Sequence, residues 1–119
     1  MTQDFKKLKV YQTAFELSRD VYKEFKEVTG NFRVKEQLIA ASTAICANLA
    51  EMAAFENKNQ QKQKIYTCIG EANETDFWLN FCREVGLLAE DKYKDFQNRV
   101  KVTRMMLFNL QDSIKEEAN

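Results

Sequence analysis

The chain has 119 residues, of which 45% are hydrophobic and 30% are charged, so it is long enough for one domain with its own core. Eighteen basic residues balance eighteen acidic ones, which leaves no net charge to attract nucleic acid or an anionic membrane. This balance excludes a protein that binds nucleic acid through its overall charge, and only a local basic patch could do so.

Histidine and proline are both absent. Without histidine, a nucleophile has no activating imidazole, and a helical bundle lacks the Glu-x-x-His motif of dinuclear metal sites. There is also no glycine-rich phosphate loop and no nucleophile elbow. We therefore expect no enzyme, no catalytic residue, no metal and no cofactor. A carboxylate metalloenzyme stays as an alternative, and its candidate ligands are Glu51, Glu71, Glu74 and Asp76.

The three cysteines, Cys46, Cys68 and Cys82, are an odd number and fall among apolar residues. Buried, reduced thiols in a cytoplasmic protein are the favoured interpretation over a disulfide. The first fifteen residues are polar and charged, unlike a signal peptide. No apolar run approaches the roughly 20 residues that span a bilayer, so we expect no membrane association.

Apolar residues at spacings of three and four predict a first helix over about residues 8–28. Its core stripe is Val10, Ala14, Leu17, Val21, Phe25 and Val28. A second stripe lies beside it and consists of Tyr11, Phe15, Ser18 and Tyr22. Gly30 and Asn31 follow, and both tolerate the left-handed conformation that ends helices.

A second helix is predicted over about residues 34–55, and its many alanines indicate that it is the most enclosed element. Its core stripe is Leu38, Ser42, Ile45, Leu49 and Met52. Asn57 with Gln60 resembles a capping box that opens a third helix over about residues 58–85. The inward residues of this helix are Ile65, Ile69, Ala72, Leu79 and Cys82. We attribute Gly70, in mid-helix, to close helix packing.

Gly86 ends the third helix, and a regular heptad pattern predicts a fourth over about residues 90–116. The heptad residues are Tyr93, Phe96, Val100, Thr103, Leu107, Leu110 and Ile114. Short connections force sequential helices to run antiparallel. The sequence therefore predicts a single all-α domain over residues 1–119, an up-down-up-down antiparallel four-helix bundle.

Polar residues on the central helices predict a structural or interface cluster of Asn48, Glu51 and Glu74, which would fix register or partner orientation. Local basic patches are the candidates for contacting nucleic acid: Lys58, Lys62, Lys64, Arg99, Lys101 and Arg104. Solvated surface charge is the simpler interpretation of each patch.

Aromatic residues exceed what four narrow helix seams need, and a surplus of apolar surface usually marks an interface. The candidate oligomer interface comprises Tyr11, Phe15, Tyr22, Phe77, Trp78 and Phe81. Stacking of exposed rings on nucleic-acid bases is the alternative use of such residues. We expect that this surplus supports self-association.

The segment from Gln37 to Glu51, which contains Ala-Asn-Leu-Ala-Glu, resembles the second helix of a bacterial four-helix-bundle family. Members are encoded by intervening sequences within 23S ribosomal RNA genes and sometimes carry a ribosomal-protein label. Related members are accessory proteins of reverse transcriptases in diversity-generating retroelements. The other matching residues are Leu8–Ala14, Gly70, Glu74, Leu79 and Gly86–Leu88.

This resemblance implies a non-enzymatic homo-oligomer, typically a five-fold ring, with a role tied to RNA or a nucleoprotein complex. Five positions depart from the family pattern: Cys46, Met52, Ala89, and the pair Phe55 and Glu56, where two basic residues are usual. The lost basic pair weakens the case for nucleic-acid binding. We therefore expect an oligomeric scaffold associated with RNA, and the alternative is an adaptor that docks a polymerase-like protein without touching nucleic acid.

Overall fold

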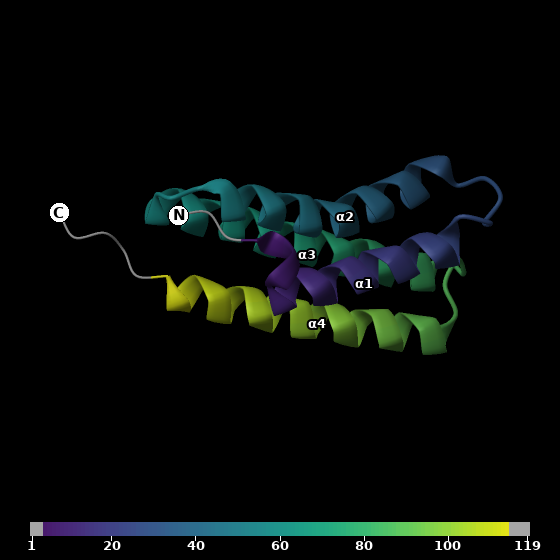
Figure 1. Ribbon diagram of the computed structural model, residues 1–119. Coiled ribbons are helices and arrows are strands. Elements are labelled where there is room, and N and C mark those ends of the chain that lie inside the picture. Colours follow the sequence, from purple (N-terminus) through teal and green to yellow (C-terminus); the bar gives the residue numbers. More distant parts are fainter. Residues whose placement is uncertain (1–3, 115–119) are drawn as a thin grey trace.

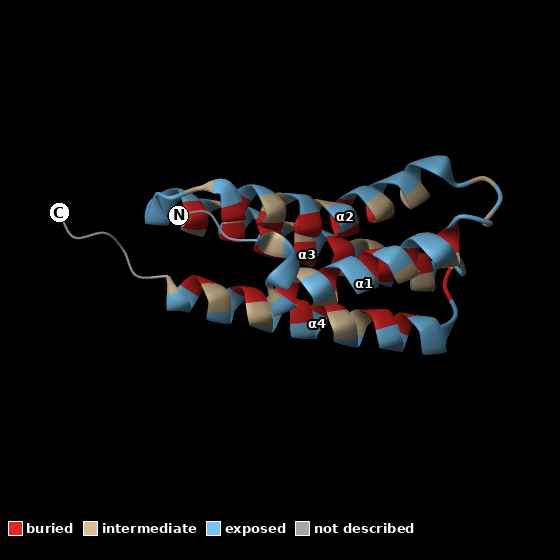
Figure 2. Ribbon diagram, viewed as in Figure 1, coloured by how far each residue is buried: buried red, intermediate tan, exposed pale blue. Residues whose placement is uncertain are grey.

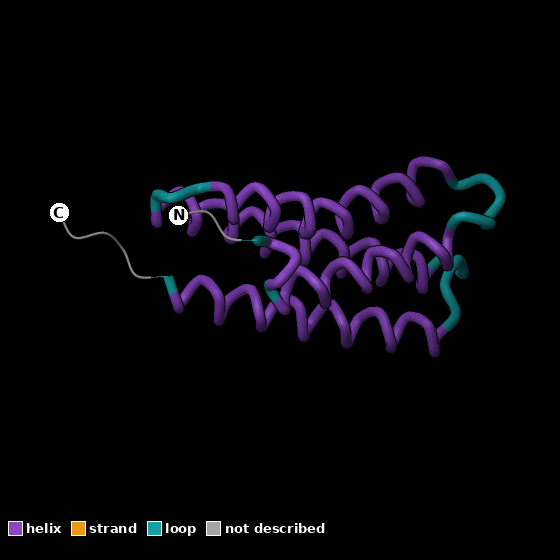
Figure 3. The backbone as a smooth tube through the Cα atoms, in the orientation of Figure 1, coloured by secondary structure: helices purple, strands orange, loops and turns teal. Residues whose placement is uncertain are grey.

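The computed structural model describes residues 4–114 and folds them into four long α-helices that run alternately up and down (Figures 1 and 3). The short 3-10 helix η1 (Phe5–Lys7) leads into α1 (Lys9–Phe25), which is followed by α2 (Phe32–Ala54), α3 (Lys58–Glu84) and α4 (Glu90–Ser113). No strand occurs within residues 4–114. The predicted all-α four-helix bundle is confirmed.

Each helix packs on two neighbours: α1 and α3 both contact α2 and α4. Among the described residues α1 and α3 do not pack on each other, so they occupy diagonal corners of the bundle. The most extensive packing joins α2 to α3. The outer face of α3 is therefore a different surface from the one that α1 and α2 form together.

The predicted core stripes are buried in all four helices (Figure 2). Leu17, Ile45, Leu79 and Leu107, one from each helix, are completely inaccessible to solvent. At the periphery of the stripes Val28, Leu110 and Ile114 are only half-buried. The heptad and 3–4 spacing of the sequence thus identifies the interior correctly.

Helix α2 has the length and mean hydropathy of a segment that could cross a membrane. The expectation that no run approaches this length was therefore too strong. A buried core helix passes the same test, and Leu38, Leu49 and Met52 of α2 lie in the bundle interior.

Three predicted helix ends differ from the structure by two or more residues. Helix α1 stops at Phe25 and not near residue 28, and the chain then turns through Gly30 and Asn31, whose φ angles are 72° and 55°. Helix α2 begins two residues early, at Phe32. Helix α4 ends at Ser113, and positions 115 and 116 of its predicted span lie outside the described residues.

Local hydrogen bonds explain two other helix starts. The Asn57 side chain accepts a bond of 2.9 Å from the Gln60 amide, which confirms the predicted cap of α3. The sequence did not predict η1, in which the Asp4 carboxylate accepts a bond of 3.1 Å from the Lys6 amide. This short helix sets Phe5 against α1, where its ring lies 5.0 Å from that of Tyr11.

The explanation of Gly70 by close packing within the chain is wrong. Gly70 is exposed, and a Cβ atom added to it would meet nothing within 4 Å. The residue therefore costs helix stability without an internal contact to account for it.

Candidate functional site

The carboxylates that could have formed a metal site do not converge. Within residues 4–114 no three Asp, Glu, Cys or His side chains are placed to hold a metal ion. Glu51 pairs with Lys64 at 2.5 Å, and Asp76 lies 3.6 Å from Arg104. Each of these two carboxylates therefore lies beside a cation of a neighbouring helix.

The predicted polar cluster is only partly assembled. Lys64 of α3 reaches α2, where its Nζ atom lies 2.5 Å from Glu51 Oε2 and 3.4 Å from Asn48 Oδ1. Asn48 also donates a bond of 2.8 Å to the Ala44 carbonyl. Glu74 lies elsewhere on α3. The structure thus joins Asn48 and Glu51 through a lysine that the sequence had assigned to nucleic acid.

Glu74 instead lies beside Glu71, one turn away on the same helix. Burial raises the pKa of Glu71 above its ordinary value, and the charge of Glu74 and a hydrogen bond with its side chain raise it further. Two neighbouring carboxylates repel each other when both are ionised. The charge of Glu74 therefore disfavours the ionised form of Glu71.

Several predicted nucleic-acid contacts are engaged within the bundle. Arg99 donates to Asp20 at 2.9 Å and lies 3.5 Å from Asp95. Arg104 donates to Asn73 at 3.1 Å and lies 3.6 Å from Asp76. The exposed Lys101 lies on α4, while Lys58 and Lys62 lie in the first two turns of α3. The arginines therefore hold helices together as well as carrying charge.

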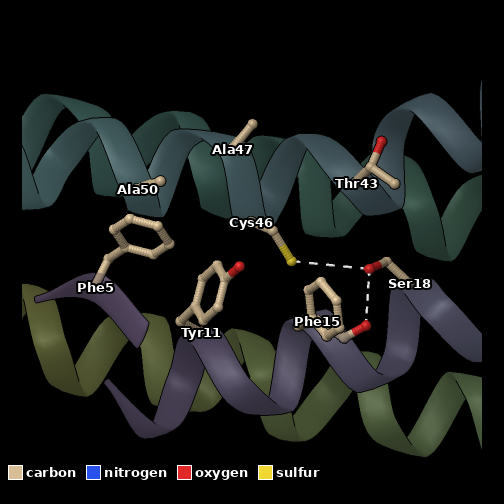
Figure 4. Close-up of a pocket in the computed structure, with 8 residues that line it drawn as sticks. All are labelled: Phe5, Tyr11, Phe15, Ser18, Thr43, Cys46, Ala47 and Ala50. Carbon is tan, nitrogen blue, oxygen red and sulfur yellow. Dashed lines mark hydrogen bonds between the residues drawn. The ribbon is translucent and has the colours of Figure 1, made fainter. Parts of the chain in front are cut away.

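Aromatic side chains line an apolar groove between α1 and α2 (Figure 4). Along one wall, the rings of Phe5, Tyr11 and Phe15 follow one another at centroid separations of 5.0 and 5.9 Å. The facing residues on α2 are small: Thr43, Cys46, Ala47 and Ala50. The cavity has a volume of about 320 Å³, which lies at the small end of ligand pockets.

Ser18 closes one side of this α1/α2 groove. Its hydroxyl donates to the Phe15 carbonyl at 2.9 Å and lies 3.8 Å from the Cys46 sulfur. Tyr22 continues the aromatic stripe along α1 and is about half exposed. The second apolar stripe predicted for the first helix thus lines this groove, and the α2 side chains that face it are small.

A second aromatic group lies on α3. Phe77, Trp78 and Phe81 contact one another, with ring centroids 4.9 to 6.4 Å apart. Trp78 is half-buried against the core, and its buried indole nitrogen has no hydrogen-bond partner among the described residues. Phe77 is 58% exposed and Phe81 is 38% exposed. These two rings therefore project from the bundle.

Tyr66 extends this second surface. It is 59% exposed and precedes Phe77 by eleven residues, about three helical turns, so both side chains lie on one face of α3. Gly70 lies between them on the same face. We call the exposed set Tyr66, Phe77 and Phe81 the α3 ridge. The six predicted interface residues thus divide between two separate surfaces, the α1/α2 groove and the α3 ridge.

The cysteines are all buried and reduced. Burial raises the pKa of the Cys68 thiol to about 12 and that of Cys82 to about 11, and it also raises the pKa of Cys46. A raised pKa keeps each thiol protonated at neutral pH, which makes it a poor nucleophile. These residues therefore act as small hydrophobic side chains.

Sequence reasoning missed Phe5, Tyr66 and the interhelical role of Lys64. Phe5 precedes the predicted first helix, so periodicity gave no reason to place it in the groove. Tyr66 had a usable signal, because its spacing from Phe77 and Phe81 is close to whole numbers of helical turns. The pairing of Lys64 with Glu51 depends on how α2 and α3 align, which spacing within one helix does not reveal.

Comparison with known proteins agrees with this architecture. A crystal structure of a protein of unknown function from the S23 ribosomal protein family of Bacteroides thetaiotaomicron VPI-5482 is similar, with a TM-score of 0.81. The match covers 87% of this chain and 99% of that one at 20% sequence identity, so it shows a shared fold. No curated protein matched the chain. The family model described as 23S rRNA-intervening sequence protein matches residues 6–109, and the chain therefore belongs to that family.

Proposed function

We propose that this protein is a non-catalytic scaffold of the cytoplasm, which associates with itself and acts by binding RNA or a ribonucleoprotein complex. The observation that carries this proposal is the presence of two separate exposed aromatic surfaces, the α1/α2 groove and the α3 ridge, on one rigid bundle. Exposed aromatic side chains that cluster in this way are typical of protein interfaces. A closed ring, with five copies as the expected number, would cover both surfaces.

Membership of a family encoded within 23S ribosomal RNA genes favours RNA as the associated molecule. Assembly would also repeat each basic residue around the particle, so that one exposed lysine per chain, such as Lys101, becomes a ring of positive charge. Such a ring would contact phosphates without reading sequence.

An adaptor that docks a polymerase-like protein is the second candidate. The engagement of Arg99 and Arg104 in ion pairs within the bundle favours it, because these side chains have less freedom to reach phosphates. The phenylalanine and glutamate at positions 55 and 56, where the family usually has basic residues, favour it as well.

Two measurements test the proposal. Light scattering should give a mass several times the 14.0 kDa mass of one chain. Binding to single-stranded and duplex RNA should then be measured between about 50 and 200 mM salt, where phosphate-driven affinity falls steeply. Absence of binding at the low-salt end would remove the RNA role, and protein partners that survive nuclease treatment in a pull-down would support the adaptor.

A further inference from the structure

The α1/α2 groove and the α3 ridge differ in shape. The groove is walled by the rings of Phe5, Tyr11 and Phe15 and faced by small α2 residues such as Ala47 and Ala50, which leave a cavity of about 320 Å³. The ridge presents large rings that project from α3, where no helix within residues 4–114 covers them. A convex aromatic surface and a concave one with small facing residues are complementary in form.

The two surfaces also differ in charge. Lys6 and Lys7 are exposed at the Phe5 end of the groove, and the Lys6 ammonium lies 5.9 Å from the Phe5 ring centroid. Glu71 and Glu74 lie within two turns of Phe77 beside the ridge. Burial and the neighbouring Glu74 charge raise the pKa of Glu71, so this pair gains from an approaching cation.

We propose that the α3 ridge of one copy of this chain seats in the α1/α2 groove of a second copy, with Lys6 and Lys7 facing Glu71 and Glu74. This contact rests on the proposed self-association and names the surfaces that make it. Phe77 and Phe81 fill the cavity beside Ala47 and Ala50. Gly70 lies between Tyr66 and Phe77 and, having no side chain, lets the opposing helix approach the α3 backbone.

Such a contact joins two different surfaces and is therefore heterologous. After two copies have joined, one ridge and one groove stay free, so further copies can add, and the assembly closes into a ring when the rotation between copies completes a full turn. The diagonal positions of α1 and α3 place groove and ridge on different sides of the bundle, as this mode of growth requires. A contact in which a ridge meets a ridge would stop at two copies.

The experiment uses one variant for each surface. Phe77→Glu places a charge on the ridge, and Ala47→Glu places one in the groove. Both residues are exposed helix positions, so each variant should fold, which circular dichroism checks. Light scattering should find each variant alone at the 14.0 kDa chain mass. An equal mixture should give twice that mass, because one intact ridge then meets one intact groove.

Met105→Glu is the matched control, since Met105 on α4 is 58% exposed, as Phe77 is. It should keep the wild-type mass. Charge reversal gives a second test: Lys6→Glu or Glu74→Lys alone should weaken association about fivefold, and the two changes in one chain should restore it.

The outcomes separate this contact from the broader proposal. A wild-type protein that stays at the mass of one chain would overturn self-association and this contact together. A wild-type oligomer that Phe77→Glu and Ala47→Glu both leave intact would overturn the contact alone. A mixture of the two variants that stays at the mass of one chain would show that ridge and groove do not meet each other.

Discussion

Arg99 of α4 donates a hydrogen bond of 2.9 Å to Asp20 of α1, two residues that lie 79 positions apart in the chain. Arg19 donates a second bond to the same carboxylate at 3.1 Å. Burial raises the pKa of Asp20, but the bonds from Arg19 and Arg99 outweigh burial and hold the pKa below its ordinary value of 3.8. Asp20 thus stays ionised in the folded protein at a pH where the unfolded chain takes up a proton.

The Asp20 carboxylate should make the free energy of unfolding depend on pH in the acidic range. A carboxylate whose pKa is lowered by folding stabilises the protein above its unfolded pKa, and this contribution is lost as pH falls through the folded value. We expect Asp20→Asn to lower the free energy of unfolding by up to about 1 kcal/mol at pH 7. The difference from wild type should vanish near pH 2 in urea titrations. An equal difference at both pH values would contradict this, and Asp95→Asn is the control.

Leu107 should be among the most costly core positions. It is completely buried on α4, so Leu107→Ala removes packed atoms and should lower the free energy of unfolding by about 2–5 kcal/mol. Met105→Ala, on the exposed face of the same helix, should cost less than about 0.5 kcal/mol. Chemical denaturation measures both. A loss below about 0.5 kcal/mol for Leu107→Ala would place this residue outside the core.

The contact of Lys64 with Glu51 and Asn48 should contribute modestly to the free energy of unfolding. The Glu51 side chain is 59% exposed, so solvent screens its ion pair, and Glu51→Ala should cost less than about 1 kcal/mol. Asn48→Ala should also lower the melting temperature, because it removes bonds to both Lys64 and the Ala44 carbonyl. If mass and melting temperature were unchanged in both variants, this polar cluster would have no structural role.

The thiols should resist modification in the folded protein. Thiolates are the reactive form, and the raised pKa values of Cys68 and Cys82, about 12 and 11, leave almost none at pH 8. We expect a colorimetric thiol reagent to label Cys68 and Cys82 only after unfolding. Cys46 should react first, since it lines the groove, and Cys46→Ala should remove that phase. Fast labelling of Cys68 in native buffer would contradict the buried assignment.

Gly70 offers a test of the stability of the isolated bundle. A Cβ atom at this position meets nothing within 4 Å, so Gly70→Ala should stabilise the isolated bundle by about 1 kcal/mol. The Ala47→Glu variant is expected to be monomeric, and its melting temperature should rise by a few degrees when Gly70→Ala is added. No gain would mean that the α3 helix is distorted at Gly70.

Much of the fold follows from the sequence, because helical periodicity and the left-handed residues Gly30 and Asn31 act locally. The burial of Leu38, Ile45 and Leu49 on α2 is visible in their spacing alone. The surfaces are harder to predict, since they depend on which helices become neighbours. The arrangement that sets Phe5 and Tyr11 opposite the small residues of α2 comes from the docking of α1 on α2, and one helix's pattern does not contain it.

The family resemblance located the second helix and the bundle correctly, yet the individual roles of charged residues needed tertiary structure. Lys64 illustrates this. In the sequence it belongs to a lysine-rich stretch, and in the fold it crosses from α3 to α2. For Gly70 the sequence misled in the other direction. A glycine in mid-helix suggests close packing within the chain, but Gly70 faces outward, where an added Cβ atom would meet nothing within 4 Å.

The neighbour relationships of the helices also bear on the order in which they form. Three of the four packed helix pairs join elements that are consecutive in the chain, and only the packing of α1 on α4 closes a loop across the whole domain. Local contacts form quickly, whereas closing a longer loop costs more entropy. We therefore expect α2 and α3 to fold together early, and the docking of α1 on α4, with its Arg99–Asp20 contact, to be the last step of folding.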